Sequence, residues 1–276
     1  MADKKLEGKV AWVTGSSRGI GRVVAQHLAD LGARVAVHGT TPVSTKAFNE
    51  APSLASVAEE IAESSGSEII AVHGDLTDES VVSANYQEIV EKLGPVDILI
   101  NNAGGDIGST GTSGPNAGKP IVNDAIEVSL EDVRTIIDRN LTTCILVCKA
   151  AVPSMMERNQ GWVVTIGSIA GLSGHRSEVA YGTAKAAVHE YTKCLAAQMR
   201  PYGVYANVIA PGEIITPRFV ASRPTTDERK VTEGSLTRYG WPIEVAKAVE
   251  FFVTADSSYV SGQILRVDGG AQLFPA

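Results

Sequence analysis

The sequence lacks the features that mark several large classes of protein. Its 276 residues carry a net charge of -7 and contain no dense cluster of Lys and Arg, which argues against a surface that binds nucleic acid or an anionic membrane. No stretch approaches the roughly 18 apolar residues of a membrane span, and the opening residues MADKKLEGKV contain no apolar signal sequence. We therefore expect a cytoplasmic protein with neither nucleic-acid nor membrane partners.

Cysteine is also scarce. The three cysteines, Cys144, Cys148 and Cys194, are odd in number, lack the spacing of metal ligands, and fall inside apolar helical patterns. We expect all three to be small buried side chains in a reducing compartment, and we expect no metal site. Because 44% of the residues are hydrophobic and no long linker interrupts the chain, residues 1–276 are predicted to form a single domain.

Short apolar runs alternate with longer helical patterns along the whole chain. Seven runs predict β-strands, at 10–13, 34–38, 68–73, 96–100, 162–166, 204–210 and 263–267. Helical patterns lie near 20–31, 53–64, 79–93, 129–157, 180–199 and 243–254. Each helix can form a right-handed crossover between parallel strands. The predicted fold class is α/β, with one doubly wound, seven-stranded parallel sheet and helices on both faces.

Two stretches rich in Gly, Ser, Thr and Pro interrupt this alternation. They are GTTPVSTKAFNEAPS (39–53), after the second strand, and GGDIGSTGTSGPNAGKP (104–120), after the fourth. Each leaves the carboxyl end of a strand, the edge at which open α/β sheets bind ligands. The two stretches either shape a ligand site or are tolerated surface insertions.

A glycine-rich turn joins the first strand to the first helix. Gly15, Gly19 and Gly21 stand in TGSSRGIG (14–21), where glycine lets the backbone turn tightly and approach a pyrophosphate. The free N–H groups and the positive end of the following helix would face that charge. The spacing G-x-x-x-G-x-G differs from the commoner G-x-G-x-x-G, so the turn alone is a weak indication of dinucleotide binding.

A tyrosine and a lysine stand one helical turn apart in YGTAK (181–185). Tyr181 and Lys185 of a helix point into the same space, although most such pairs in proteins are an interface tyrosine and a solvated lysine. Five further motifs occur in order with them, namely TGSSRGIG (14–21), NNAG (101–104), DRNL (138–141), TIGS ending at Ser168, and PGEIIT (211–216). With VSGQILRVDGG (260–270) near the end, the chain resembles the classical short-chain dehydrogenase/reductase family over nearly its whole length.

The resemblance implies a Rossmann-fold enzyme that transfers a hydride between a nicotinamide cofactor and a carbonyl or secondary alcohol carbon. In such enzymes a tyrosine, here Tyr181, is the general acid or base. The pKa of free tyrosine is about 10, and a cation about 4 Å away contributes about 4 kcal/mol at an effective dielectric of about 20. We therefore expect the Lys185 ammonium to lower the pKa of Tyr181 toward neutrality.

Two more residues complete the catalytic set that the resemblance implies. Ser168, at the end of a predicted strand, would hold the substrate oxygen against Tyr181, and its alternative role is a cap or turn serine. Asn140 lies in the middle of a long predicted helix, where an amide has poor propensity. By the resemblance, Asn140 binds a water that extends a proton relay through Lys185.

The resemblance also implies a set of cofactor contacts. The glycine turn would hold the pyrophosphate, Asn102 and Asp75 would support the ribose and adenine side, and residues 211–216 would flank the nicotinamide. The expected cofactor-binding residues are Gly15, Ser17, Arg18, Gly19, Ile20, Gly21, Gly39, Thr40, Thr41, Asp75, Leu76, Asn102, Ala103, Gly104, Tyr181, Lys185, Pro211, Gly212, Ile214 and Thr216.

The end of the second strand predicts NADP(H) in preference to NAD(H). Enzymes that select NAD place an Asp or Glu there to bind the ribose hydroxyl and repel a phosphate, whereas this chain has Gly39. Arg18 can reach the phosphate with a guanidinium fork, and the hydroxyls of Thr40 and Thr41 can donate to the same oxygens. The long loop after Thr41 could present a different group, so NAD(H) stays open.

The substrate end is less specific. His175, Glu178, Glu213 and Asp106 lie in segments that border the pocket in similar proteins, and each alone is better explained as a solvated loop charge. Together they favour a small polar substrate, with a substrate lid at about 213–240. The reaction direction and the physiological substrate are not predicted.

A homo-oligomer, most simply a tetramer, is expected from the two long helices. Apolar residues such as Ile145, Val147, Val188 and Leu195 stand on more than one helical face, which exceeds what covering a sheet requires. The alternative is deeper burial within one subunit.

Two rival functions stay open at this stage. One is a cofactor-binding protein of the same fold that does not catalyse a reaction, although such a protein does not need the full set of Ser, Tyr, Lys and Asn. The other is a sugar-nucleotide epimerase or dehydratase, which usually carries a large C-terminal substrate domain and another glycine spacing.

Overall fold

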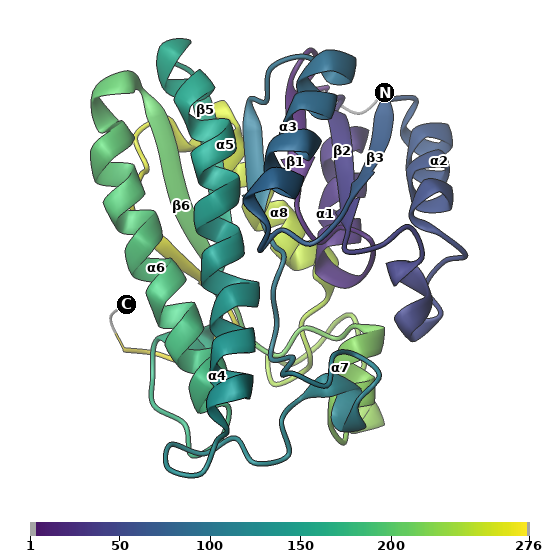
Figure 1. Cartoon of the computed structure of the whole chain (residues 1–276), viewed down its shortest axis with the longest axis vertical. Helices are drawn as coiled ribbons and strands as arrows, with labels where there is room; N and C mark the ends of the chain where they lie inside the picture. The colour runs from purple at the N-terminus through teal and green to yellow at the C-terminus, as the bar shows by residue number, and fades with distance from the viewer. Residues whose placement is uncertain (1–3, 275–276) are drawn as a thin grey trace.

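Seven parallel strands form one sheet, in the order β3-β2-β1-β4-β5-β6-β7 (Figure 1). The computed structural model describes residues 4–274. The strands are β1 (Val10–Val13), β2 (Arg34–Gly39), β3 (Ile69–His73), β4 (Ile98–Asn101), β5 (Gly161–Ile166), β6 (Val204–Pro211) and β7 (Ile264–Val267). All seven predicted strands are present, and the predicted α/β fold class is confirmed.

The helices cover both faces of this sheet. Their bounds are α1 (Gly19–Asp30), α2 (Leu54–Ser65), α3 (Glu79–Leu93), α4 (Leu130–Ile137), α5 (Thr143–Glu157), α6 (Val179–Met199), α7 (Pro217–Ser222) and α8 (Pro242–Val253). One buried cluster joins α1, α2 and α8 to the sheet, and a second joins α3, α5 and α6 to its other face. In Figure 1, α3, α5 and α6 lie in front of the strands.

The central strand β1 shows how the sequence builds both cores. Side chains alternate across a strand, so Ala11 and Val13 join the cluster with α1, α2 and α8, while Val10 and Trp12 join the cluster on the other face. All four are buried, and Trp12 is completely inaccessible to solvent. Burying each of the larger side chains contributes roughly 1.5–3 kcal/mol.

Two sequence predictions about helices need correction. The helix expected over 129–157 is interrupted by a π-helical turn at Asp138–Thr142, which separates α4 from α5. Within α6, Cys194 is exposed, so the prediction that all three cysteines are buried is wrong for this one. Cys194 lies on the solvent-exposed side of α6, whereas Cys144 and Cys148 belong to the buried cluster between the helices and the sheet.

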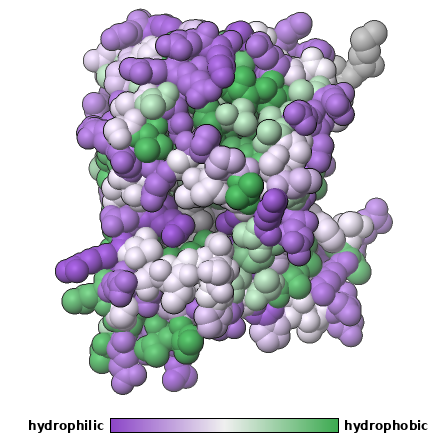
Figure 2. Space-filling view, turned by 45° about the vertical axis from the view of Figure 1, so that its right-hand side comes forward, coloured by the Kyte–Doolittle hydropathy of each residue, from purple (hydrophilic) through white to green (hydrophobic). Residues whose placement is uncertain are grey.

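The apolar residues used to predict an oligomer also need correction. Val147, Val188 and Leu195 lie in the buried cluster on the α5 and α6 face of the sheet, so they complete the core of one subunit and carry no argument for a second copy. Ile145, in contrast, is half-buried and belongs to none of the buried clusters. On the face drawn in Figure 2, hydrophilic side chains surround several separate apolar patches.

Residues 213–240 form an excursion whose two ends are joined. The Gly240 N–H donates to the Glu213 carbonyl at 2.9 Å, and the Ile215 N–H donates to the Gly240 carbonyl at 2.8 Å. The short helix α7, which the sequence pattern did not predict, lies inside this excursion. Within residues 4–274, no helix is both long and apolar enough to cross a membrane.

Candidate functional site

A cavity of about 1310 Å³ lies at the carboxyl edge of the sheet. It extends from the glycine turn after β1, past the ends of β4, β5 and β6, to α7. β1 pairs with β2 on one side and with β4 on the other, so the strand order reverses there. Open α/β sheets bind ligands at this point. Single drug-sized ligands fill roughly 300–1,000 Å³, so this cavity has room for a dinucleotide together with a substrate.

The glycine turn has the close packing that a dinucleotide cradle requires. A Cβ on Gly21 would lie 2.4 Å from Asn102 Nδ2 and 2.6 Å from the Gly15 carbonyl oxygen. Gly15 has a φ of 63°, a value that side chains disfavour. Asn102 Nδ2 donates to the Thr14 and Gly15 carbonyls, both at 3.0 Å, and so fixes the turn to the end of β4. These residues fit a nicotinamide dinucleotide.

A buried histidine supports the same turn, and the sequence analysis missed it. His38 Nδ1 accepts from the Gly15 N–H at 3.2 Å, while Nε2 lies 3.1 Å from the Gly74 carbonyl. Burial lowers the pKa of His38 to about 4, so the ring is neutral at pH 7 and Nε2 is the donor. One indication of this role was present in the sequence, because His38 is a polar residue inside a strand predicted to be buried.

The loop after β2 lies against the start of α1. The Gly19 N–H donates to Glu50 Oε2 at 2.8 Å, and Oε1 of the same carboxylate is buried without a hydrogen-bond partner. Arg18 Nη1 donates to the Ser44 carbonyl at 2.6 Å, and its guanidinium lies 5.2 Å from the centre of the Phe48 ring. Glu50 and Ser44 line the cavity, so this loop borders the site.

Sequence analysis did not identify Glu50 as a site residue. No motif marks it, because its place at the glycine turn depends on how a 15-residue loop folds. Arg139, also missed, lines the cavity with its Nε buried and unpartnered. Arg139 is close enough to Arg18 to lower the pKa of that guanidinium further, after burial.

Nearly all of the predicted cofactor-binding residues line this one cavity. They are Gly15, Ser17, Arg18, Gly19, Ile20, Gly21, Gly39, Thr40, Asp75, Leu76, Asn102, Ala103, Gly104, Tyr181, Lys185, Pro211, Gly212, Ile214 and Thr216. Thr41 is exposed and is not part of the lining, because the chain turns there and the Thr41 carbonyl accepts from the Ser44 N–H.

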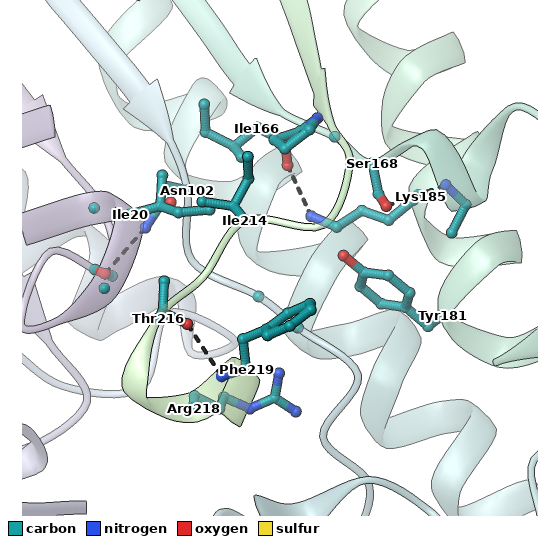
Figure 3. A pocket seen from close by; sticks show the side chains of 18 of the residues that line it. Ile20, Asn102, Ile166, Ser168, Tyr181, Lys185, Ile214, Thr216, Arg218 and Phe219 are labelled. Carbon is teal, nitrogen blue, oxygen red and sulfur yellow. Dashed lines mark hydrogen bonds between the residues drawn. The ribbon is translucent and has the colours of Figure 1, made fainter. Parts of the chain in front are cut away.

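Tyr181 and Lys185 lie one turn apart on α6 and face the cavity together with Ser168 (Figure 3). Lys185 is buried, and its Nζ donates to the Ile166 carbonyl at the end of β5 at 2.8 Å. Nζ also lies 5.7 Å from the centre of the Tyr181 ring. The helix and the strand end therefore bring the three predicted residues together.

The expected effect of Lys185 on Tyr181 is not present in this structure. Burial raises the pKa of Tyr181 to about 12, and a hydrogen bond with Ser168 is the largest opposing influence. Burial also lowers the pKa of Lys185 to about 8. Both side chains are desolvated, which disfavours their charged forms. In this state Tyr181 is a protonated phenol, able to donate a proton.

Ser168 has the capping role that the sequence left open, and its hydroxyl also lies within hydrogen-bond reach of Tyr181. Its Oγ accepts from the Ala170 N–H at 3.1 Å and so caps a short 3₁₀ turn, while the hydroxyl hydrogen remains available toward Tyr181. The Ser168 N–H donates to Nε2 of His189 at 3.3 Å. Burial lowers the pKa of His189 to about 4, so this second missed histidine is a neutral support behind the serine.

Asn140 lies in the π-helical turn between α4 and α5. Its Oδ1 accepts from the Gly105 N–H at 2.9 Å, and its Nδ2 donates to the Gly105 carbonyl at 3.0 Å and the Ile136 carbonyl at 2.7 Å. Both amide hydrogens are therefore used to hold the loop after β4. A Cβ on Gly104 would lie 2.4 Å from Asn140 Oδ1 and 3.6 Å from Lys185 Nζ, so these groups pack tightly.

The substrate end of the cavity contains most of the predicted polar residues. His175, Glu178 and Glu213 line it, whereas Asp106 is buried behind it and accepts from Asn123 Nδ2 at 3.2 Å. Helix α7 adds residues that the sequence analysis did not single out, namely Arg218, Phe219 and Ser222. Among residues 4–274, no group of three or more His, Cys, Asp or Glu could hold a metal ion.

The family model described as "short chain dehydrogenase" matches residues 9–227. The chain belongs to the short-chain dehydrogenase family. The match spans the glycine turn, Ser168, Tyr181 and Lys185. As a family member it is an oxidoreductase that acts with a nicotinamide cofactor on CH–OH or C=O groups.

Three proteins similar to this chain over nearly its whole length are named after different substrates. Cyclohexanol dehydrogenase of Rhodococcus sp. (strain TK6) is 40% identical, with 96% of each chain covered. A putative gluconate dehydrogenase structure from Agrobacterium tumefaciens has a TM-score of 0.82 at 31% identity, covering 99% of this chain and 100% of that one. A 3-oxoacyl-[acyl-carrier protein] reductase from Brucella melitensis with bound NAD has a TM-score of 0.80 at 27% identity, covering 98% and 94%.

Proposed function

We propose that this dehydrogenase interconverts a secondary alcohol and a ketone, with Tyr181 as the general acid or base. The observation that carries the proposal is the meeting of Tyr181, Ser168 and Lys185 in the cavity that begins at the glycine turn. When bound, the nicotinamide cofactor supplies the hydride donor or acceptor. The four residues Ser168, Tyr181, Lys185 and Asn140 are proposed to be the catalytic set.

In the reducing direction, the protonated phenol of Tyr181 donates its proton to the oxygen that becomes the alcohol. The Ser168 hydroxyl holds that oxygen by a hydrogen bond. Lys185, fixed to the Ile166 carbonyl, presents its ammonium beneath the tyrosine and stabilises the negative phenolate left behind. Because the side-chain N–H groups of Asn140 are already used, a relay water would have to donate to one of its oxygens.

NADP(H) is the cofactor that we propose as preferred. Gly39 leaves no carboxylate at the end of β2, and Thr40 lines the cavity beside it. Arg18 uses Nη1 for the Ser44 carbonyl, while Nε and Nη2 donate to no residue in 4–274. Arg139 adds a second cation nearby. Each charge-assisted hydrogen bond to a phosphate contributes roughly 1.5–3 kcal/mol.

NAD(H) is the competing assignment, and one observation favours it. Glu50 brings a carboxylate to the glycine turn from the loop after β2. Its unpartnered Oε1 could accept from a ribose hydroxyl, and its charge would repel a phosphate. The preference between NADP(H) and NAD(H) therefore depends on whether the positive charge of Arg18 or the negative charge of Glu50 has the larger effect on the cofactor.

The substrate is proposed to be small and polar. Glu178, Glu213 and Arg218 line the end of the cavity beyond Tyr181, and an apolar ring system would leave the buried Nε of Arg218 without a hydrogen-bond partner. We propose that residues 213–240 are the substrate lid of a single domain, because the excursion carries α7 against this end and its two stems are joined.

We also propose a homo-oligomer, a tetramer in the first instance, located in the cytoplasm. Support for the oligomer comes from the edge strand β7 and its surroundings, where Phe251, Tyr259 and Leu265 are exposed. Support for a reducing compartment comes from the cysteines, none of which forms a disulfide. Light scattering that returned the mass of one chain, 29.0 kDa, would contradict the oligomer.

The test of the proposed reaction is a matched panel of alcohols and ketones with each cofactor. The panel includes cyclohexanol, polyols, hydroxy acids and their ketones, followed by the absorbance of the reduced nicotinamide. Turnover of at least one pair in both directions supports the proposal. Tight binding of reduced cofactor without turnover of any pair would favour the rival, a cofactor-binding protein that does not catalyse.

A further inference from the structure

Arg218 is placed at the substrate end with part of its hydrogen-bonding capacity unused. It lies in α7, and Figure 3 shows its guanidinium and the Tyr181 ring reaching into the pocket from two different helices. Nη2 donates to the Asp106 carbonyl at 2.6 Å. Nε is buried, and neither Nε nor Nη1 donates to any residue in 4–274. The protein therefore uses only Nη2 of this guanidinium, and Nε and Nη1 have no hydrogen-bond partner among residues 4–274.

The surrounding charges only partly offset this guanidinium, because the charge of Asp106 acts on it without forming an ion pair with it. Lys119 forms ion pairs with Glu178 and, at 3.8 Å, with Asp106. Arg223 lies 3.6 Å from Glu178. The two carboxylates are thus shared by Lys119 and Arg223, while Arg218 has no carboxylate within ion-pair distance among the described residues. Three cations against two carboxylates leave one positive charge uncompensated beside Tyr181.

Burying a guanidinium with unpaired N–H groups destabilises the folded protein unless a ligand accepts hydrogen bonds from those groups. Burial lowers the pKa of Arg218, because its charged form is poorly solvated there. Nη1 lies near Gly105, since a Cβ on that glycine would be 3.6 Å away. Gly105 places no side chain against Nη1, and Arg218 lines the cavity, so a ligand in the cavity can reach its free N–H groups. A planar carboxylate is the group that matches such a guanidinium.

We propose that Arg218 binds a carboxylate of the substrate, so that this enzyme acts on a hydroxy acid and its oxo acid. The carboxylate would accept hydrogen bonds from Arg218 while the alcohol oxygen meets Tyr181 and Ser168. This inference rests on the proposed function for the reaction itself. It adds that the substrate carries a negative charge and that Arg218 binds this charge.

Direct binding tests the subsite without requiring turnover. The probes are cyclohexanecarboxylate and the neutral cyclohexanecarboxamide, titrated by calorimetry into the protein saturated with reduced cofactor, whose nicotinamide ring is uncharged. We expect wild type to bind the carboxylate at least about tenfold more tightly than the amide, as one or two charge-assisted hydrogen bonds would give. Arg218→Gln should bring the two affinities together, and Arg218→Lys should restore part of the difference.

The matched control is Arg223→Gln, which removes the same charge from a residue of the same pocket that already has a carboxylate partner. It should keep the preference for the carboxylate. Binding of reduced cofactor, followed by its fluorescence, shows that each variant is folded. Equal wild-type affinity for carboxylate and amide, no binding of either, or equal loss in both arginine variants would overturn the proposal.

Turnover of hydroxycyclohexanecarboxylate and its amide then separates this inference from the proposed function. A hydroxy acid preferred through KM, with the preference lost in Arg218→Gln, supports both. Turnover of acid and amide with equal kcat/KM overturns the carboxylate subsite and leaves the dehydrogenase standing. Carboxylate binding that depends on Arg218, without turnover of any alcohol in the wider panel, contradicts the proposed function and supports the subsite.

Discussion

Arg18 at the glycine turn and Arg218 beside Tyr181 line the same cavity but differ in their partners. Arg18 donates to the Ser44 carbonyl, lies over Phe48 and has Glu50 as its strongest electrostatic partner. Arg218 has one backbone acceptor, no ion pair among the described residues, and a buried Nε without a partner. Both cations keep donors free for a ligand, because neither forms an ion pair among the described residues. At the cofactor end the carboxylate of Glu50 opposes an anionic ligand, whereas near Arg218 the carboxylates of Asp106 and Glu178 are paired with Lys119 and Arg223. The neighbouring carboxylates, more than the residue type, therefore distinguish the two arginines.

The largest effect is expected where the two ends meet, at Tyr181. Tyr181→Phe keeps the ring in place but removes the ionisable proton, so turnover should fall by about 10² to 10⁴. Affinity for reduced cofactor should stay within a few fold of wild type, because the glycine turn is untouched. Steady-state kinetics and cofactor fluorescence check the two parts. Activity within about tenfold of wild type would remove Tyr181 from the mechanism.

A fall in pH should destabilise the folded protein through two buried histidines, one at the cofactor end and one at the catalytic end of the cavity. His38 supports the glycine turn and His189 supports Ser168, and each has a folded-state pKa of about 4 against an ordinary value of 6.5. Between these values the unfolded chain binds more protons, so stability falls as pH drops from 6.5 to 4 and is fully present above that range. The loss is at most about 3 kcal/mol for each histidine.

Urea unfolding at several pH values measures this loss. His38→Asn and His189→Asn should each flatten the pH dependence, and the exposed His175→Asn should leave it as in wild type. An unchanged slope in both buried variants would show that acid acts elsewhere.

A smaller effect is expected at the cofactor end. Glu50→Gln keeps an acceptor for the Gly19 N–H but removes the charge, so the ratio of kcat/KM for NADP(H) to that for NAD(H) should rise about tenfold, or about 1.4 kcal/mol. Arg18→Ala should lower the ratio. Glu60→Gln, on α2 and paired with Arg22, is the matched control and should change nothing. A ratio indifferent to both Glu50 and Arg18 would show that cofactor choice is made by other residues.

The two ends also differ in how far the sequence could predict them. At the catalytic end, Tyr181 and Lys185 are one turn apart in a single helix, so local geometry places them together once the helix is recognised. The alternation of short apolar runs with helical patterns likewise predicted all seven strands, because each run and each helix is a local pattern. The π-helical turn at Asp138–Thr142 has no such pattern, and it was missed.

Long-range placement is what the sequence left undetermined. Glu50 meets Gly19 across 31 positions, and Arg218 meets Asp106 across 112, through loops without a regular period. His38 and His189 occupy positions of ordinary core residues, and only their hydrogen bonds to Gly15 and Ser168 reveal that they support the site. The pKa of Tyr181 was mispredicted because Coulomb attraction was counted without the cost of burial.

Isotope transfer tests the central claim most directly, that Tyr181 moves the proton while hydride passes between substrate and cofactor. Cyclohexanol or a hydroxy acid, deuterated at the carbinol carbon, is oxidised with NAD(P)⁺ in ordinary water, and the reduced cofactor is analysed by mass spectrometry. The account predicts one deuterium in the cofactor with wild type, and deuterium transfer at least about a hundredfold slower with Tyr181→Phe even when that variant is saturated with cofactor. Reduced cofactor without deuterium, or undiminished transfer by Tyr181→Phe, would contradict it.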